Sequence, residues 1–294
     1  MTLRTVDLVM TSSPTSHFLS WWRLTRPWNV LAMGVMVTLV LRWQGFPLGD
    51  LLHLGRIGWV LVPMLVGAAG NLINDYFDVR EDRINKPERA LVGRTVKRRV
   101  VVVTHWGFSA AAFSWSAWLS SEAGSLWPLL MVAVFSVVLY LYSPVLKGRG
   151  AWGNIAISLC VAGLVAWGGM ASGDWAEPGQ GRSLWILAGI VGWLNFLREW
   201  VKDIQDLEGD RVAHHHTMAM HLTALQNRNG LLIGMLLGGL GMLAWGTSMP
   251  LSWWRMLPML IFFIGVVTTT IQQKSKSVSA WLKVLIGSLY LLII

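Results

Sequence analysis

Six aspartates of the chain stand in two groups with the same spacings of three and four residues: Asp75, Asp78 and Asp82, then Asp203, Asp206 and Asp210. On one helix, residues at such spacings share a face, so each group predicts a column of carboxylates that repel one another. Cations would make such a column tolerable. Ten of the 15 acidic residues lie in or beside the two groups, a concentration that solubility alone does not explain.

The aspartate groups contain no Cys or His between their aspartates, and sites built from carboxylate oxygens alone suit Mg²⁺ or Mn²⁺ better than zinc. Magnesium in proteins is typically held by one or two carboxylates together with phosphate oxygens of a substrate. Two facing columns would therefore hold metal ions and grip a diphosphate between them. The sequence contains neither an EF-hand calcium loop nor a Walker-type phosphate loop, which disfavours those two kinds of site.

The elements that must position these columns are membrane-length apolar segments. The 294 residues are 54 % hydrophobic and 13 % charged, about half the charged fraction of a soluble domain. We expect an all-α, polytopic membrane bundle of nine transmembrane helices around a central cavity. The expected spans are residues 27–45, 57–77, 99–119, 126–143, 151–171, 183–201, 229–247, 253–272 and 278–294.

Basic residues predict the orientation of this bundle. With a cytoplasmic N-terminus, nineteen Lys and Arg fall on the cytoplasmic side and four on the opposite side. Both aspartate groups then face the cytoplasm, and we expect the cavity to open there, in a multi-pass protein of the cell membrane. The net charge of +9 does not indicate nucleic acid, because the basic residues sit in short loops between apolar runs.

Three stretches resemble a known family. NDYFDVREDRINKPERALVGR (74–94) and REWVKDIQDLEGD (198–210) resemble the two aspartate-rich motifs of the UbiA superfamily of intramembrane prenyltransferases. INKPER and KDIQDLEGD are most similar to the geranylgeranylglycerol-phosphate geranylgeranyltransferase branch. YSPVLKGRGAWGN (142–154) resembles the loop in which the family places a diphosphate-binding lysine, here Lys147.

The resemblance implies a single transmembrane prenyltransferase domain over residues 1–294, with motifs at 71–82 and 198–210. It implies Mg²⁺-dependent transfer of a prenyl group, geranylgeranyl in this branch, from an allylic diphosphate to a lipid acceptor such as geranylgeranylglyceryl phosphate, with release of pyrophosphate. The expected metal ligands are Asn71, Asp75, Asp78, Asp82, Asp203, Asp206 and Asp210. The expected catalytic residues are Asp75, Asp78, Asp203 and Lys147. The expected substrate contacts are Asn71, Arg94, Lys147, Lys202, Asn29, Arg26 and Asn154.

Alternatives stay open at this point. The acceptor could instead be an aromatic ring of the 4-hydroxybenzoate type, as in quinone biosynthesis. The twin motifs could also come from the duplicated halves of a secondary transporter, although a transporter's charges gather near the midplane. A non-catalytic scaffold is a third possibility, and no obligatory protein partner is indicated.

One stretch departs from the branch. His214 stands where the branch has glycine, Met218 and Ala219 replace Leu-Pro, and we expect the histidines at 214–216 to form a solvated interfacial loop.

Overall fold

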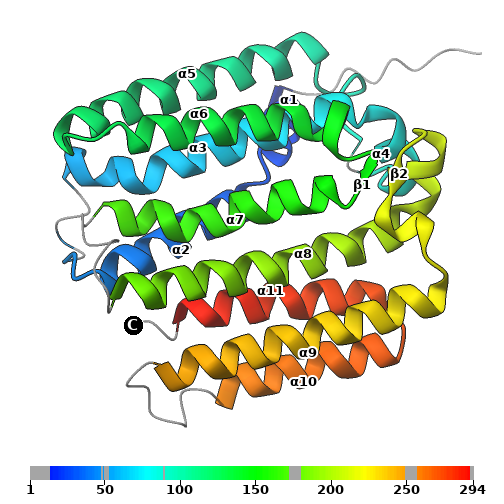
Figure 1. Ribbon diagram of the computed structural model, residues 1–294. Helices are drawn as coiled ribbons and strands as arrows, with labels where there is room; N and C mark the ends of the chain where they lie inside the picture. The colour runs from blue at the N-terminus through cyan, green and yellow to red at the C-terminus, as the bar shows by residue number, and fades with distance from the viewer. Residues whose placement is uncertain are drawn as a thin grey trace, which may run out of the picture.

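The computed structural model describes residues 14–47, 49, 53–88, 90–171, 180–248 and 257–291. The long helices run roughly side by side as a bundle, and the short elements α4, β1 and β2 gather at one end of it (Figure 1). The described elements are α1 (Pro14–Leu24), α2 (Pro27–Trp43), α3 (Leu54–Phe77), α4 (Val79–Asn85), α5 (Arg98–Glu122), α6 (Trp127–Leu141), the π-helical turn η2 (Tyr142–Leu146), β1 (Arg149–Gly150), α7 (Trp152–Met170), α8 (Gln180–Val212), β2 (His216–Thr217), the 3₁₀ turn η4 (Met218–His221), α9 (Ala224–Ser248), α10 (Leu257–Ile271) and α11 (Ser275–Leu291).

Each of the nine expected spans overlaps one of these α-helices. The span residues beyond the α-helix ends or outside the described residues are 44–45, 126, 142–143, 151, 171, 253–256, 272 and 292–294. By length and apolar composition, five described helices can cross a membrane, and six if the bent pair α1–α2 counts as one span. The helix α10 is only 15 residues long, and α5 begins with two arginines. The protein is thus helical with several apolar helices, whereas nine crossings stay a prediction.

Apolar side chains cover much of the outer surface of the bundle. Rows of leucine, isoleucine and valine are more than half exposed on the outer faces of three helices, among them Val134 and Val137 of α6, Ile233, Leu236, Leu237, Leu240 and Leu243 of α9, and Leu260, Ile261 and Ile264 of α10. Contiguous apolar surface on this scale marks contact with lipid or with another protein. Together with the apolar spans, it fits a bundle immersed in a bilayer.

A bend between α1 and α2 brings a cation inward. The two helices meet at 47° across Thr25 and Arg26. Pro27 occupies the first turn of α2, where its missing N–H costs nothing, and disfavours helical backbone at the residue before it. Arg26 adopts the left-handed conformation, with φ at 52°, which is unfavourable for a non-glycine residue. The strained turn directs the Arg26 guanidinium onto Asp75 of α3.

The first aspartate group does not lie on one helix, so the expected single column is wrong there. The helix α3 ends at Phe77, Asp78 caps it, and α4 begins at Val79. Asp75 therefore lies on α3, Asp78 at the junction and Asp82 on α4. In the second group the expectation is confirmed, because α8 continues without a break through all three aspartates to Val212.

The helix α4 docks directly on α8 between the aspartates of the second group. Asn85, at the end of α4, donates from Nδ2 to the carbonyl oxygen of Asp206 (3.1 Å) and accepts through Oδ1 from the N–H of Gly209 (3.0 Å). A glycine is required at this contact, because a Cβ on residue 209 would lie 2.2 Å from the Asn85 amide nitrogen. The pair holds the two aspartate groups against each other.

Candidate active site

A cavity of about 1060 Å³ runs between α1, α2, α3, α4, α6, α7, α8 and α11. Both aspartate groups line it. Towards the middle of the bundle its walls are apolar, formed chiefly by Met33, Val62, Val66, Val132, Phe135, Leu139, Ile157, Val161, Leu164 and Trp167. From Asp78 back to Val62, the 1.5 Å rise per residue gives a length of about 24 Å along α3. The cavity thus joins a charged end to a long apolar interior.

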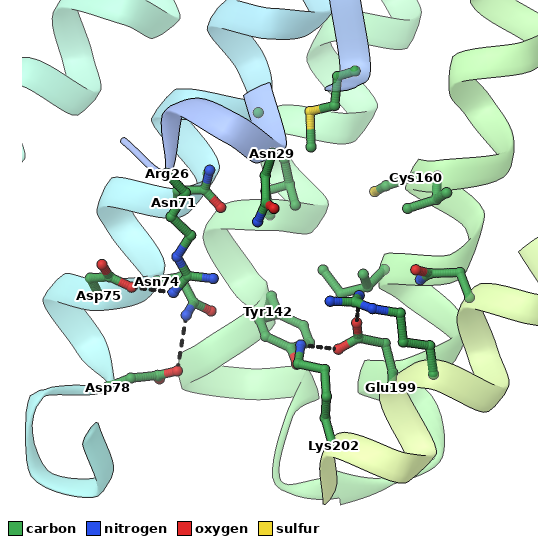
Figure 2. A pocket seen from close by; sticks show the side chains of 18 of the residues that line it. Arg26, Asn29, Asn71, Asn74, Asp75, Asp78, Tyr142, Cys160, Glu199 and Lys202 are labelled. Atoms are coloured by element: carbon green, nitrogen blue, oxygen red, sulfur yellow. Dashed lines mark hydrogen bonds and ion pairs between the residues drawn. The ribbon is translucent and has the colours of Figure 1, made fainter. Parts of the chain in front are cut away.

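The two aspartate groups approach the cavity from different helices. Figure 2 shows Asp75 and Asp78 on one side of the open space and Glu199 and Lys202 of α8 on the other, with Tyr142 between them. Closer to the end of the bundle, carboxylate oxygens of Glu81 from α4 and Asp210 from α8 come within 4.8 Å of each other. The segments that carry the two groups therefore face one another across the cavity (Figure 2).

Most of the carboxylates at the charged end are paired with cations. Arg26 forms an ion pair with Asp75, and Lys86 with Asp206 at 2.5 Å. On α8, Glu199 accepts from Arg198 at 2.8 Å and from Lys202 at 2.6 Å. An anionic substrate that enters the cavity therefore finds guanidinium and ammonium groups already drawn to its walls.

Lys147 sits at the centre of the first group. It caps the turn η2, and its Nζ lies 2.8 Å from both Asp78 Oδ2 and Glu81 Oε1. Burial alone would lower the pKa of Lys147, but the two carboxylates raise it well above its ordinary value. Burial and the neighbouring Asp78 raise the pKa of Glu81 to about 7. Burial favours a neutral Asp78, but the charge of Lys147 and the hydrogen bonds from Glu81, Lys147 and Ser143 together outweigh it and lower the pKa of that carboxyl.

Two aspartates lack a cation within salt-bridge distance among the described residues. Burial, together with Asp75 and Asp78, raises the pKa of Asp82 to about 6. Asp203 accepts a hydrogen bond from the buried Asn154 amide at 2.8 Å. Because both carboxylates line the cavity, each offers oxygen atoms that a cation can take.

Of the seven expected substrate contacts, five line the cavity, and Arg94 and Asn154 do not. Arg26, Lys147 and Lys202 line the charged end of the cavity, and Asn29 points into it from α2 (Figure 2).

Arg94 does not reach the cavity. Its guanidinium lies in an exposed loop and donates to the carbonyl of Pro87 at 3.1 Å, because residues 91–96 form a turn closed by a Val92–Val96 bridge. Asn154 lies behind Asp203 and not on the cavity wall.

Asn71 lines the cavity, but its amide donates to the Thr25 carbonyl at 3.0 Å and so anchors the α1–α2 bend. The amide that supports the first aspartate group is that of Asn74, one turn further. It donates to Asp78 Oδ2 at 3.0 Å and accepts from the Ser143 hydroxyl at 2.7 Å. Its spacing of four residues from Asp78 was the available signal in the sequence.

The expectation of a solvated histidine loop is wrong for its central member. His214 and His216 are exposed, whereas His215 turns inward between Glu81 and Asp210. Glu81 and Glu199, which sequence reasoning left without a role, are both buried and each holds a lysine of the site. Two glutamates beside two aspartate groups were visible in the sequence, but their direction on the helix was not.

The donor set at this end fits a divalent cation that prefers oxygen. Buried carboxylate oxygens without a hydrogen-bond partner include Oδ1 of Asp78 and Oδ1 of Asp210, one from each group. Leaving such oxygens unmatched costs free energy, and a bound cation would remove that cost. Mg²⁺ takes carboxylates and phosphate oxygens in this way.

Known proteins resemble the chain in sequence and fold. Residues 31–289 match the model of the UbiA prenyltransferase family. A digeranylgeranylglyceryl phosphate synthase of Korarchaeum cryptofilum is 31 % identical over 214 residues, which are 72 % of this chain and 70 % of that protein. A synthase of the same name from Metallosphaera sedula is 35 % identical over 162 residues, so the match spans only 54 % of that relative. A solved structure of a digeranylgeranylglyceryl phosphate synthase has a TM-score of 0.68 over 94 % of this chain and 97 % of its own, at 20 % identity, which shows the same fold.

Proposed function

The chain belongs to the UbiA prenyltransferase family and is a prenyltransferase, and from this premise we propose that it transfers a geranylgeranyl group from an allylic diphosphate to a glycerol-phosphate lipid acceptor, in a Mg²⁺-dependent reaction that releases pyrophosphate. The observation that carries the proposal is one cavity with a doubly acidic end and a long apolar interior. The names of the relatives support the acceptor class.

The charged end is where the diphosphate would bind. Asp75, Asp78, Asp82, Asp203, Asp206 and Asp210 are the proposed ligands of Mg²⁺, with Asn71 beside the first group. When bound, Mg²⁺ supplies a Lewis acid that stabilises the negative charge developing on the leaving pyrophosphate. Lys147 is placed to share this work, because Asp78 Oδ2 and Glu81 Oε1 hold its ammonium group beside the proposed metal ligands and it stays charged.

The apolar interior would hold the prenyl chain. Ten apolar side chains from α2, α3, α6 and α7 would surround the chain and keep water from the allylic carbon. The rings of Phe135 and Trp167 and the phenol of Tyr142 line the same space, and aromatic faces attract the positive charge that develops on that carbon. Their contribution is electrostatic and needs no proton transfer.

The acceptor phosphate needs cations of its own. Arg198 and Lys202 of α8 both bind Glu199, and Arg26 stands across the cavity on the α1–α2 bend. Together they offer charge that is separate from Lys147, so the two phosphate-bearing substrates need not compete for one cation. Asn29 adds a hydrogen-bonding amide on the same wall as Arg26.

We also propose how the protein lies in the membrane. We place nine crossings, one prenyltransferase domain over residues 1–294, and the charged end of the cavity at the cytoplasmic face, where the positive-inside rule puts the basic loops. The prenyl diphosphate carries its charge into the cytoplasm while its tail prefers the bilayer. A cavity with one charged end and one apolar end suits both.

Purified protein in detergent, given Mg²⁺ and geranylgeranyl diphosphate, tests the proposal with two acceptors in parallel. Geranylgeranylglyceryl phosphate should be alkylated, and chelation of Mg²⁺ should abolish the product. Prenylation of 4-hydroxybenzoate alone would overturn the acceptor class. No prenyl transfer to either acceptor, with Asp203→Asn abolishing ion-coupled uptake in vesicles, would favour a transporter.

A further inference from the structure

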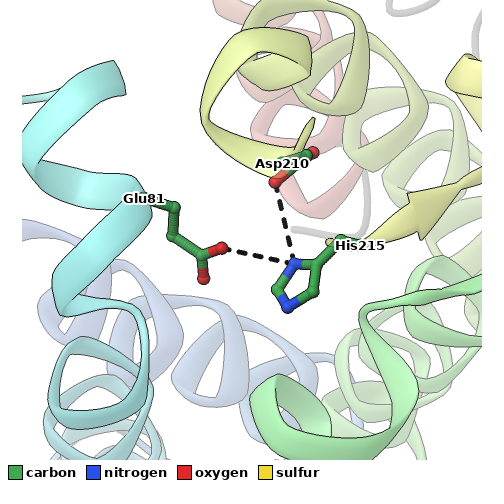
Figure 3. A group of neighbouring side chains, drawn as sticks. All are labelled: Glu81, Asp210 and His215. Carbon is green, nitrogen blue, oxygen red and sulfur yellow. Dashed lines mark ion pairs between the residues drawn. The ribbon is translucent and has the colours of Figure 1, made fainter. Parts of the chain in front are cut away.

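Three side chains with metal-ligating atoms converge at the edge of the cavity. Glu81 of α4, Asp210 near the end of α8 and His215 of the following loop point at one another (Figure 3). One ligand atom from each lies within 4.8 Å of the other two. We propose that these three side chains bind a divalent transition-metal ion in preference to Mg²⁺.

The three atoms that face one another have no hydrogen-bond partner. They are Oε2 of Glu81, Oδ1 of Asp210 and Nδ1 of His215, and each is itself buried. Between themselves they make only ion-pair contacts, which require a protonated His215: its Nδ1 lies 3.3 Å from the Glu81 oxygen and 3.9 Å from the Asp210 oxygen. The side chains of Glu81 and Asp210 are only 5 % and 2 % exposed, so water does not compensate for the missing bonds.

The spacing suits a shared ion. Two ligands at roughly 2.1 Å from a metal lie about 3 to 4.4 Å apart, depending on the angle between them. Donors within 4.8 Å need to close by only a few tenths of an ångström. A cation would also cancel the repulsion between two carboxylates that are both removed from water.

The backbone is arranged to hold the histidine there. His214 adopts the left-handed conformation, with φ at 58°, and the N–H of His215 donates to the Asp210 carbonyl at 2.9 Å. Pairing of β1 with β2 then fixes the loop from the other side. Gly148 leaves space for the ring, since a Cβ there would lie 3.2 Å from His215 Cδ2.

The donor set determines which ions fit. Imidazole nitrogen with two carboxylates suits Mn²⁺, Fe²⁺ or Zn²⁺, whereas Mg²⁺ prefers oxygen donors only. Asp210 also lines the cavity, but Glu81 Oε2 and His215 set this site apart from the all-oxygen aspartate groups. The other oxygen of Glu81 binds Lys147, so an ion here would clamp α4 to the loop after α8 beside the lysine of the active site.

Mn²⁺ added to the full-length protein in excess Mg²⁺ tests the site without any activity measurement. Pulsed electron paramagnetic resonance detects a ¹⁴N nucleus bonded directly to Mn²⁺, and the aspartate groups provide no such nitrogen. We expect the nitrogen signal in the wild type and in His216→Ala, whose histidine is exposed on the same loop. His215→Ala should lose the signal and weaken Mn²⁺ binding at least tenfold, since even the loss of a supporting group costs that much.

The unfolding temperature of His215→Gln in Mg²⁺ alone, compared with that of the wild type, shows whether this variant folds. Absence of the nitrogen signal in folded wild type, or its persistence in folded His215→Gln, would overturn the site and leave an ion pair between protonated His215 and the two carboxylates. Because prenyl transfer is assayed separately in Mg²⁺, failure of either proposal is recognised independently of the other.

Discussion

Replacing Gly209 by alanine should disturb the contact that holds the two aspartate groups together. The new Cβ would lie 2.2 Å from Nδ2 and 2.7 Å from Oδ1 of Asn85, closer than real contacts allow. The Asn85 amide must then move and give up its hydrogen bonds to the Asp206 carbonyl and the residue 209 N–H. Two such bonds contribute about 1–3 kcal/mol net, against which alanine regains up to about 1 kcal/mol as the better helix former.

A second variant tests the same contact, because Asn85→Ala removes the two hydrogen bonds that Gly209→Ala disrupts. Asn85→Ala alone should cost about the same 1–3 kcal/mol. In the double variant the clash is gone, so the double variant should be no less stable than Asn85→Ala. Its loss of unfolding free energy should be well below the sum of the losses of the two single variants. Thermal unfolding in detergent with Mg²⁺ measures stability, and prenyl transfer should fall in each variant because the aspartate groups separate.

Gly189→Ala is the matched control, because it lies on the same helix with nothing within 4 Å of its added Cβ. It should leave both stability and activity at or above the wild-type level. If Gly209→Ala behaved like Gly189→Ala, or if the two variants added in the double, the docking of α4 on α8 would be refuted.

Three further variants or conditions test single parts of the site. Lys147→Met keeps the side-chain length but removes the charge shared by Asp78 and Glu81, and it should lower the rate of prenyl transfer by about 10²–10³-fold. Arg94→Met is the control in the same assay and should leave the rate unchanged, because the Arg94 guanidinium lies outside the cavity. Asn154→Ala removes the 2.8 Å hydrogen bond that orients Asp203 and should lower kcat/KM roughly ten- to a hundredfold, and a wild-type value would show that Asp203 needs no support. The raised pKa of Asp82, about 6, means that this carboxyl binds a proton as the pH falls through 6. Calorimetric Mg²⁺ affinity should therefore drop below pH 6 by up to about tenfold per pH unit, whereas an affinity that is unchanged between pH 6 and pH 5 would remove Asp82 from the ligand set.

Much of the site could be predicted because the spacing of its residues along the sequence indicates which side chains lie together. The aspartates at 203, 206 and 210 share a face of one uninterrupted helix, so a helical period alone gave their arrangement. Arg26, Lys147 and Lys202 were found through short motifs next to apolar runs, and all three line the cavity. The spans were read from hydropathy, which locates helices well because lipid tolerates little else.

The parts that escaped prediction depend on contacts between segments far apart in the chain. The break at Asp78 and the docking of Asn85 on Gly209 arise where α4 meets α8, more than a hundred residues away. Arg94 carries the right charge, but a local turn holds it outside. His215 is the clearest case, because three consecutive histidines look alike in sequence and only the backbone turn at His214 selects which one is buried.

The central claim is that the two aspartate groups form one binding site, and a structure with a thio-substituted geranylgeranyl diphosphate and Mn²⁺ tests it most directly. The account predicts anomalous metal peaks between the groups, with at least one carboxylate from Asp75, Asp78 or Asp82 and one from Asp203, Asp206 or Asp210 bound to metal ions that contact the same diphosphate. The prenyl tail should follow the apolar wall along α3 towards Val62. A diphosphate held by one group alone, or bound outside the cavity, would contradict the account.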